Sequence, residues 1–292
     1  MPGPWVPRPP LHAARGGLDS VDADGVIYAI GGFEPIQDSV EMRDPVSEEW
    51  TFVEPMTMPR ANPGAAYVNG RIYVVGGNTG QDSATNTGES FDRATNEWSK
   101  IRNRQRGPIL GPGATAFDGR VYLIGGGEQG GITDFISIYD PTTDKWSHKT
   151  KPMPTARYLL RAVTLDGQIY AVGGVVGDNQ PFSKALERYN PITDTWTSLR
   201  PMSVGRGNPG VAVAADGRII VVGGAGGVFL SGTPLQSVEA YDPQTDLWAP
   251  SEDALPVARA SLSAEPALGN TVVAFGGFVA GEASARVESR LA

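Results

Sequence analysis

The stretch DGVIYAIGG, residues 24–32, recurs in similar form along the chain and decides how it folds. It joins a two-residue turn, Asp24-Gly25, to an apolar run that ends in the pair Gly31-Gly32. Asp-Gly and Asn-Gly turns favour positive φ angles, so the stretch predicts the tight turn and second strand of a β-hairpin. Related Gly-Gly pairs, 45 to 53 residues apart, begin at Gly31, Gly76, Gly125, Gly173, Gly223 and Gly276. The sequence is therefore built from six copies of one unit.

Each unit continues beyond its Gly-Gly pair in the same way. A polar loop leads to a third short strand, as in ERYNP at 187–191, which ends in an acidic or amide turn. A tryptophan then opens a fourth strand in five of the units, at Trp50, Trp98, Trp146, Trp196 and Trp248. The unit predicts a four-stranded antiparallel sheet, with its aromatic residues packed against the neighbouring sheets.

The period, the Gly-Gly pairs and the tryptophans together resemble the kelch family over essentially the whole chain. The resemblance implies an all-β fold, a six-bladed β-propeller in which four-stranded blades surround a central channel. We expect one domain over residues 1–292. Its blades are expected at about 15–56, 60–104, 109–152, 157–202, 206–254 and 259–292, the last completed by residues 3–9.

The last unit ends without a tryptophan-led strand, and the start of the chain supplies one. Trp5 precedes Arg15 by 10 residues, and in four other units the tryptophan precedes the arginine by 10 or 11 residues, as Trp50 precedes Arg60 by 10. We therefore expect WVPRP, residues 5–9, to be the outer strand of the last blade, so that the N-terminus closes the ring. Proline suits such a strand because its outer edge needs no backbone donor.

Composition narrows the classes of partner. The 292 residues carry a formal net charge of -8 and a pI near 4.9, which disfavours nucleic acids and anionic membranes. The absence of cysteine excludes disulfides, thiolate nucleophiles and cysteine-based metal sites. No apolar run has transmembrane length and no signal peptide is evident. We expect a cytoplasmic monomer.

Two stretches of the sequence match part of a cofactor-binding or metal-binding motif but lack another feature that the motif requires. Gly125, Gly127 and Gly130 match G-x-G-x-x-G, but a strand follows where dinucleotide binding needs a helix. Some kelch relatives bind iron through a Glu-x3-Asp-x3-His pattern. In this chain, Glu34 and Asp38 match the first two positions of that pattern, but Met42 stands in place of the histidine. We expect no cofactor and no metal.

A repeated arginine and a repeated glutamate have two interpretations. The arginines begin five units at the expected channel mouth, where they would bind an anionic ligand: Arg15, Arg60, Arg157, Arg206 and Arg259. The glutamates lie on the third strands: Glu41, Glu89, Glu187, Glu239 and Glu288. The third unit lacks both, with Ile109 and Ser137 at these positions, and this joint absence favours Arg–Glu pairing within the scaffold.

Residues that break the repeat are the better candidates for function. Asp19 and Arg161 occupy an inner-strand position that is small or apolar in other units, and Glu265 is a further inner-strand charge. With His12, they are the candidate catalytic groups at the channel mouth. The loops after the Gly-Gly pairs and the neighbouring connections add candidate ligand-binding residues: Glu34, Asn78, Glu128, Tyr158, Asp178, Asn179 and Phe229.

Four basic residues alternate in the long connection SKIRNRQRGPILGPG. Lys100, Arg102, Arg104 and Arg106 are expected on one face of an outer strand, where charges block aggregation through the sheet edge. An acidic partner site is the alternative.

Two functions remain at this point. The first is a binding module that recognises a protein or peptide on the loop-lined face around the channel. The alternative is a small-molecule enzyme, an isomerase, cyclase or lyase, with its pocket at the channel mouth. Sugar mutarotases that share the kelch fold illustrate this second class.

Overall fold

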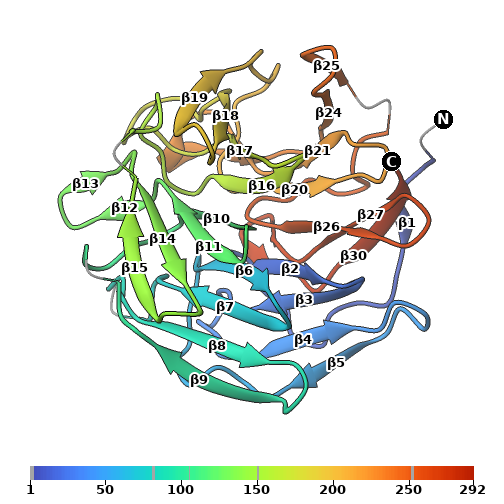
Figure 1. Cartoon of the computed structure of the whole chain (residues 1–292). Helices are drawn as coiled ribbons and strands as arrows, with labels where there is room; N and C mark the ends of the chain where they lie inside the picture. Colours follow the sequence, from blue (N-terminus) through green and yellow to red (C-terminus); the bar gives the residue numbers. More distant parts are fainter. Residues whose placement is uncertain (1–2, 81–82, 105, 150, 251–252) are drawn as a thin grey trace.

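The computed structural model describes residues 3–80, 83–104, 106–149, 151–250 and 253–292. These residues form six four-stranded antiparallel sheets around a central channel (Figure 1), so the fold is the predicted six-bladed β-propeller. Positions 81, 82, 150, 251 and 252, which fall in the second, third and fifth expected blades, lie outside the described residues.

Every blade runs from an inner strand at the channel to an outer strand at the rim. Blades 1 to 3 comprise β2 (Asp19–Ala23), β3 (Val26–Ile30), β4 (Val40–Arg43) and β5 (Trp50–Val53); β6 (Gly64–Val68), β7 (Arg71–Val75), β8 (Gly88–Asp92) and β9 (Glu97–Ile101); β10 (Gly113–Phe117), β11 (Arg120–Ile124), β14 (Ile136–Asp140) and β15 (Lys145–His148). Blades 4 to 6 comprise β16 (Arg161–Leu165), β17 (Gln168–Val172), β18 (Leu186–Asn190) and β19 (Thr195–Ser198); β20 (Gly210–Val213), β21 (Ile219–Val222), β24 (Val238–Asp242) and β25 (Leu247–Pro250); β26 (Ser263–Ala267), β27 (Thr271–Phe275), β30 (Val287–Leu291) and β1 (Val6–Pro7).

The repeated turn and glycine pair act as the sequence predicts. Asp24 and Gly25 both have positive φ, 56° and 85°, as a tight hairpin between β2 and β3 requires. Gly31 also has a positive φ of 60°, and a Cβ atom there would lie 2.3 Å from the carbonyl oxygen of Arg60. The pair therefore lets the start of the next blade pass directly against the end of the second strand.

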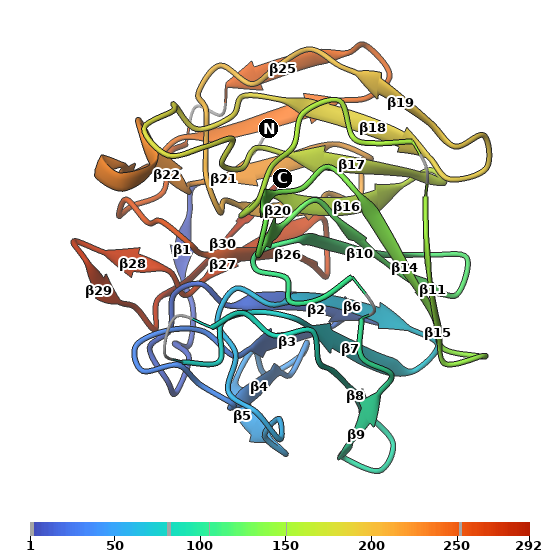
Figure 2. The same ribbon diagram turned by 90° about the vertical axis from the view of Figure 1, so that its left-hand side faces the viewer.

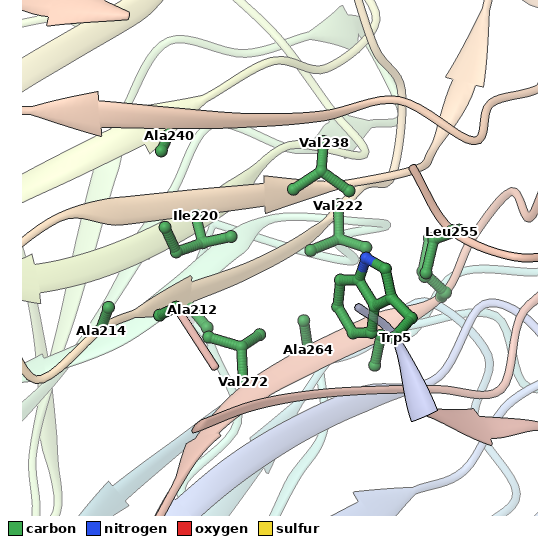
Figure 3. Close-up of a cluster of buried hydrophobic side chains, with 13 residues drawn as sticks. Trp5, Ala212, Ala214, Ile220, Val222, Val238, Ala240, Leu255, Ala264 and Val272 are labelled. Carbon is green, nitrogen blue, oxygen red and sulfur yellow. The ribbon is translucent and has the colours of Figure 1, made fainter. Parts of the chain in front are cut away.

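The N-terminal strand closes the ring. β1 pairs antiparallel with β30, with Val6 opposite Ser289 and Pro7 opposite Glu288. Trp5 is 7% exposed and lies among apolar side chains of blades 5 and 6, including Val222 and Leu255 (Figure 3). The predicted closure is confirmed, because this indole fills the space between the last two blades.

The propeller has two distinct faces. Turns between first and second strands and between third and fourth strands lie on one side, here called the hairpin face. Connections from second to third strands, and from one blade to the next, lie on the other, the loop face. Three small hairpins project from the loop face, two of them at the left of Figure 2: β12 (Gly127–Glu128) with β13 (Gly131–Ile132), β22 (Ala225–Gly226) with β23 (Thr233–Pro234), and β28 (Phe278–Val279) with β29 (Glu282–Ala283).

Candidate functional site

The repeated arginines pair with the repeated glutamates inside the blades. In blade 1, Arg15 donates to Glu41 at 2.8 Å and to the carbonyl of Gly31 at 2.9 Å. All five arginine side chains are at most 1% exposed, and all five form the ion pair: Arg15–Glu41, Arg60–Glu89, Arg157–Glu187, Arg206–Glu239 and Arg259–Glu288. The pairing interpretation is confirmed. These guanidinium groups are unavailable to a ligand, so Arg15, Arg60, Arg206 and Arg259 are not carried into the site.

Blade 3 obtains its arginine from elsewhere in the chain. The side chain of Arg104 is 1% exposed, donates to Ser137 Oγ at 3.1 Å and forms an ion pair with Glu128. The expectation that Arg104 faces outward with Lys100 and Arg102 is therefore wrong. The same ion pair engages the carboxylate of Glu128, one of the predicted ligand-binding residues.

A ring of left-handed residues narrows the channel at the loop face. The residue two positions beyond each repeated arginine, or beyond Ile109, has a φ between 46° and 61°: Gly17, Asn62, Gly111, Leu159, Asn208 and Ser261. Backbone hydrogen bonds of 2.7 to 3.0 Å join neighbouring members of this ring, for example from the Leu159 N–H to the Gly111 carbonyl. Asn208 also donates to the Asn62 side chain across the ring at 2.8 Å. The blades are thus tied to one another around a constricted opening.

Asp19 and Arg161 meet below this ring. They form an ion pair across the channel, and Asp19 also accepts hydrogen bonds from the backbone N–H groups of Ala65 and Ser20. Arg161 further donates to the carbonyls of Leu18 and Pro209, at 2.9 and 3.1 Å. The structure therefore brings together two predicted candidates. Each neutralises the charge of the other, and the pair spans the channel.

Beyond the Asp19–Arg161 pair lies a cavity of about 270 Å³, lined by the inner strands of all six blades. Its polar residues include Ser20, Asp22 and Glu265, and Ser20 donates to Glu265 at 2.6 Å. Burial, together with the nearby Asp22 and Asp19 charges, raises the pKa of Glu265 to about 8. Tyr67, a lining residue near the hairpin face, is partly exposed.

His12 lies away from the channel. Its backbone N–H donates to Glu41 Oε2 at 2.7 Å, and its ring nitrogen Nδ1 lies 3.1 Å from the same oxygen. The imidazole is half exposed and packs against Phe52 of the outer strand β5. The structure therefore does not bring His12 together with Asp19, Arg161 and Glu265.

The predicted loop residues are spread around the loop face. Glu34, Asp178 and Asn179 are exposed, whereas Asn78 uses its side chain to accept from the Gly80 N–H at 2.8 Å. Tyr158 and Phe229 do meet, with ring centroids 5.6 Å apart.

A cluster here called the apolar patch surrounds this contact and consists of Tyr158, Phe182, Phe229 and Leu230. The Phe182 ring lies 6.2 Å from that of Phe229, and Leu230 is 72% exposed. Phe229 and Leu230 belong to η1 (Phe229–Ser231), the short 3₁₀ turn between β22 and β23. Sequence reasoning missed Phe182 and Leu230, since a single apolar residue in a polar loop carries no periodic signal.

The patch rests on contacts that fix its shape. Phe182 is 6% exposed and packs where any Cβ atom at Gly205, Gly207 or Gly232 would lie within 2.6 Å of it. The loops of blades 4 and 5 are hydrogen-bonded to each other, from the Phe182 N–H to the Gly227 carbonyl at 3.0 Å. The two loops therefore hold the partly exposed Phe229 ring in place before any partner binds.

The described residues contain no group of three or more His, Asp or Glu side chains placed to hold a metal ion. Within the same ranges, none of the helical segments has the length and apolar character needed to cross a bilayer.

The blades, their glycine pairs and their buried Arg–Glu pairs define a β-propeller of the kelch type. The model of the KLHDC2/KLHL20/DRC7 Kelch-repeats domain matches residues 17–206, and that of the Kelch motif matches residues 206–252. The chain therefore belongs to the kelch-repeat family.

Relatives and a solved structure agree with this assignment. The chain is 29% identical to beta-scruin of Limulus polyphemus over 74% of its length, and 32% identical to Kelch-like protein 23 of Mus musculus over 66%. It spans only 25% and 34% of those two proteins. The solved structure titled "Structure of YjhT" superposes with a TM-score of 0.81 over 96% of each chain, at 18% identity, which establishes a shared fold.

Proposed function

We propose that the protein is a binding module that recognises a segment of another protein on its loop face, at the apolar patch. The observation that carries the proposal is the exposure of Leu230, at 72%, beside aromatic rings that two hydrogen-bonded loops hold in place. Large apolar side chains presented in this way favour binding, because little conformational entropy is lost when a partner covers them.

Three of the four candidate residues for catalysis, Asp19, Arg161 and His12, support this choice over an enzyme. Asp19 and Arg161 are bonded to each other across the channel, and His12 is bonded to Glu41 away from it. A general acid or base has to reach the proton that it transfers, and these contacts supply no acid–base pair at the loop face.

A peptide selection tests the proposal. Peptides from a random library displayed on phage are selected on the immobilised protein, and their affinities are measured by calorimetry. Leu230→Asp should weaken binding by roughly tenfold or more, as expected when a charge enters an apolar contact. The control is Ile192→Asp, since Ile192 is 81% exposed on the hairpin face.

The melting temperatures of both variants should stay close to that of the unmodified protein, because both side chains are exposed. The proposal fails if the selected peptides bind the Leu230→Asp variant as tightly as they bind the unmodified protein.

A further inference from the structure

The described second-to-third strand connections of the loop face carry more exposed carboxylates than exposed bases. Within the described residues of these connections, Lys184 and Arg286 are the exposed bases, and the exposed carboxylates number four: Glu34, Asp38, Asp178 and Glu282. None of these six residues forms an ion pair with any other residue that the structure describes. By contrast, Glu128 on the same face is neutralised by Arg104.

Asp178 is the carboxylate at the edge of the patch. It lies in the loop that carries Phe182, four residues further along, and is exposed. Its charge reaches Tyr158, because it adds to burial in raising the pKa of that phenol to about 12. Lys184, the basic residue of the same loop, follows Phe182 in the sequence, whereas Asp178 precedes it. The backbone carbonyl of Lys184 accepts a hydrogen bond from the Met202 N–H at 2.9 Å. The patch therefore has a carboxylate beside it.

The aromatic rings favour the same kind of charge. The rings of Tyr158 and Phe229 are tilted by 72° to each other, and a cation near a ring face is attracted by its π electrons. An adjacent carboxylate adds to this attraction, and it repels a partner that carries Asp or Glu at that place.

We infer that the partner segment combines an apolar side chain, which packs on Phe229 and Leu230, with a neighbouring lysine or arginine that meets Asp178. This inference rests on the proposed function and specifies the chemistry of its partner. The apolar contact provides most of the affinity, whereas the charge pair selects among partners and accelerates their association.

The peptides selected on the protein also test this inference. Sequencing should find lysine or arginine enriched next to an apolar residue in those peptides whose binding Leu230→Asp weakens. For such peptides, Asp178→Asn should lower the affinity roughly threefold, the size expected for one partly exposed charge pair, and should flatten the salt dependence.

The control removes one carboxylate from the opposite face. Glu97→Gln changes an exposed residue where β9 begins, near the hairpin face, and should leave affinity for the same peptides unchanged. Patch-dependent peptides that are acidic or uncharged, or that bind Asp178→Asn as tightly as the unmodified protein, would overturn the inference while the proposed function stands. If the selected peptides bind the Leu230→Asp variant as tightly as the unmodified protein, both the inference and the proposed function are overturned.

Discussion

The charged inner-strand residues Asp19, Arg161 and Glu265 have different roles, although all of them occur where other blades have small or apolar residues. Asp19 and Arg161 neutralise each other and accept or donate further bonds to the backbone of several blades. Glu265 forms no ion pair with any described residue: it accepts a hydrogen bond from the Ser20 hydroxyl, and the charges of Asp22, Asp19 and Arg161 act on its carboxyl group. The first two residues hold the blades together, whereas Glu265 places a carboxyl group in a cavity.

Stability at alkaline pH should depend on Glu265. Its folded pKa of about 8 exceeds its ordinary value of 4.5, so between these values the folded protein retains a proton that the unfolded chain has released. The stabilising contribution is complete below pH 4.5 and is lost as the pH rises toward 8. Glu265→Gln should therefore be stabilising at pH 8 by roughly 2–4 kcal/mol, since a tenfold change in acid strength is worth about 1.4 kcal/mol.

Urea unfolding at pH 5 and pH 8 measures this effect. The difference between Glu265→Gln and the unmodified protein should be larger at pH 8, whereas the exposed Glu34→Gln should show equal effects at both values. A Glu265→Gln effect that does not change with pH would show that this carboxyl is ionised in the folded protein.

Among the elements, the connection between blades 2 and 3 compensates for a departure from the repeat. Ile109 replaces the usual arginine, and the longer connection brings Arg104 to the place where blade 3 needs a buried cation. Ser137 and Glu128 then accept its hydrogen bonds in place of the repeated glutamate. The connection is thus part of the blade's core.

Removing this cation should destabilise the protein strongly. Arg104→Ala leaves Glu128 with only Arg106, whose Nε lies 3.8 Å from the carboxylate, and loss of one member of a buried ion pair typically lowers the free energy of unfolding by about 3–5 kcal/mol. Arg102→Ala is the matched control, because its side chain is 56% exposed. Chemical denaturation of the two variants measures the difference, and equal stabilities would contradict a structural role for Arg104.

For the whole molecule, the ring depends on contact between the two ends of the chain. Trp5 packs between blades 5 and 6, and its indole N–H donates to the Asp253 carbonyl at 3.2 Å. The guanidinium of Arg290, in the last strand, lies 5.5 Å from the Trp5 ring centroid. One residue at the N-terminus therefore contacts both the fifth and the sixth blade.

Trp5→Ala should weaken this closure. Truncation of a buried aromatic side chain typically lowers the free energy of unfolding by about 3–5 kcal/mol, and deletion of residues 1–10 should destabilise the protein further. Val6→Ala is the control, since Val6 is 44% exposed on the same strand. Thermal melting that is unchanged by the deletion would mean that β1 contributes nothing to closure.

The periodic features of the fold were predictable from the sequence because each of them recurs. Gly-Gly pairs, hairpin turns and tryptophans report local geometry that is needed in every blade, and Trp5 was recognisable by its spacing from Arg15. The joint absence of arginine and glutamate in the third unit likewise indicated their pairing. Leu159, with a φ of 49°, carried no such signal, because only the ring of backbone bonds holds it there.

The sequence by itself determined the number of blades, their strand order and the residues that tie each blade together, since these follow from local pattern and repetition. Only the tertiary structure decided that Arg104 replaces a missing arginine, that Asp19 and Arg161 satisfy each other, and that Phe182 supports an exposed patch with Phe229 and Leu230. These contacts join residues of different blades or distant loops. Their existence depends on how the ring packs, which no local pattern records.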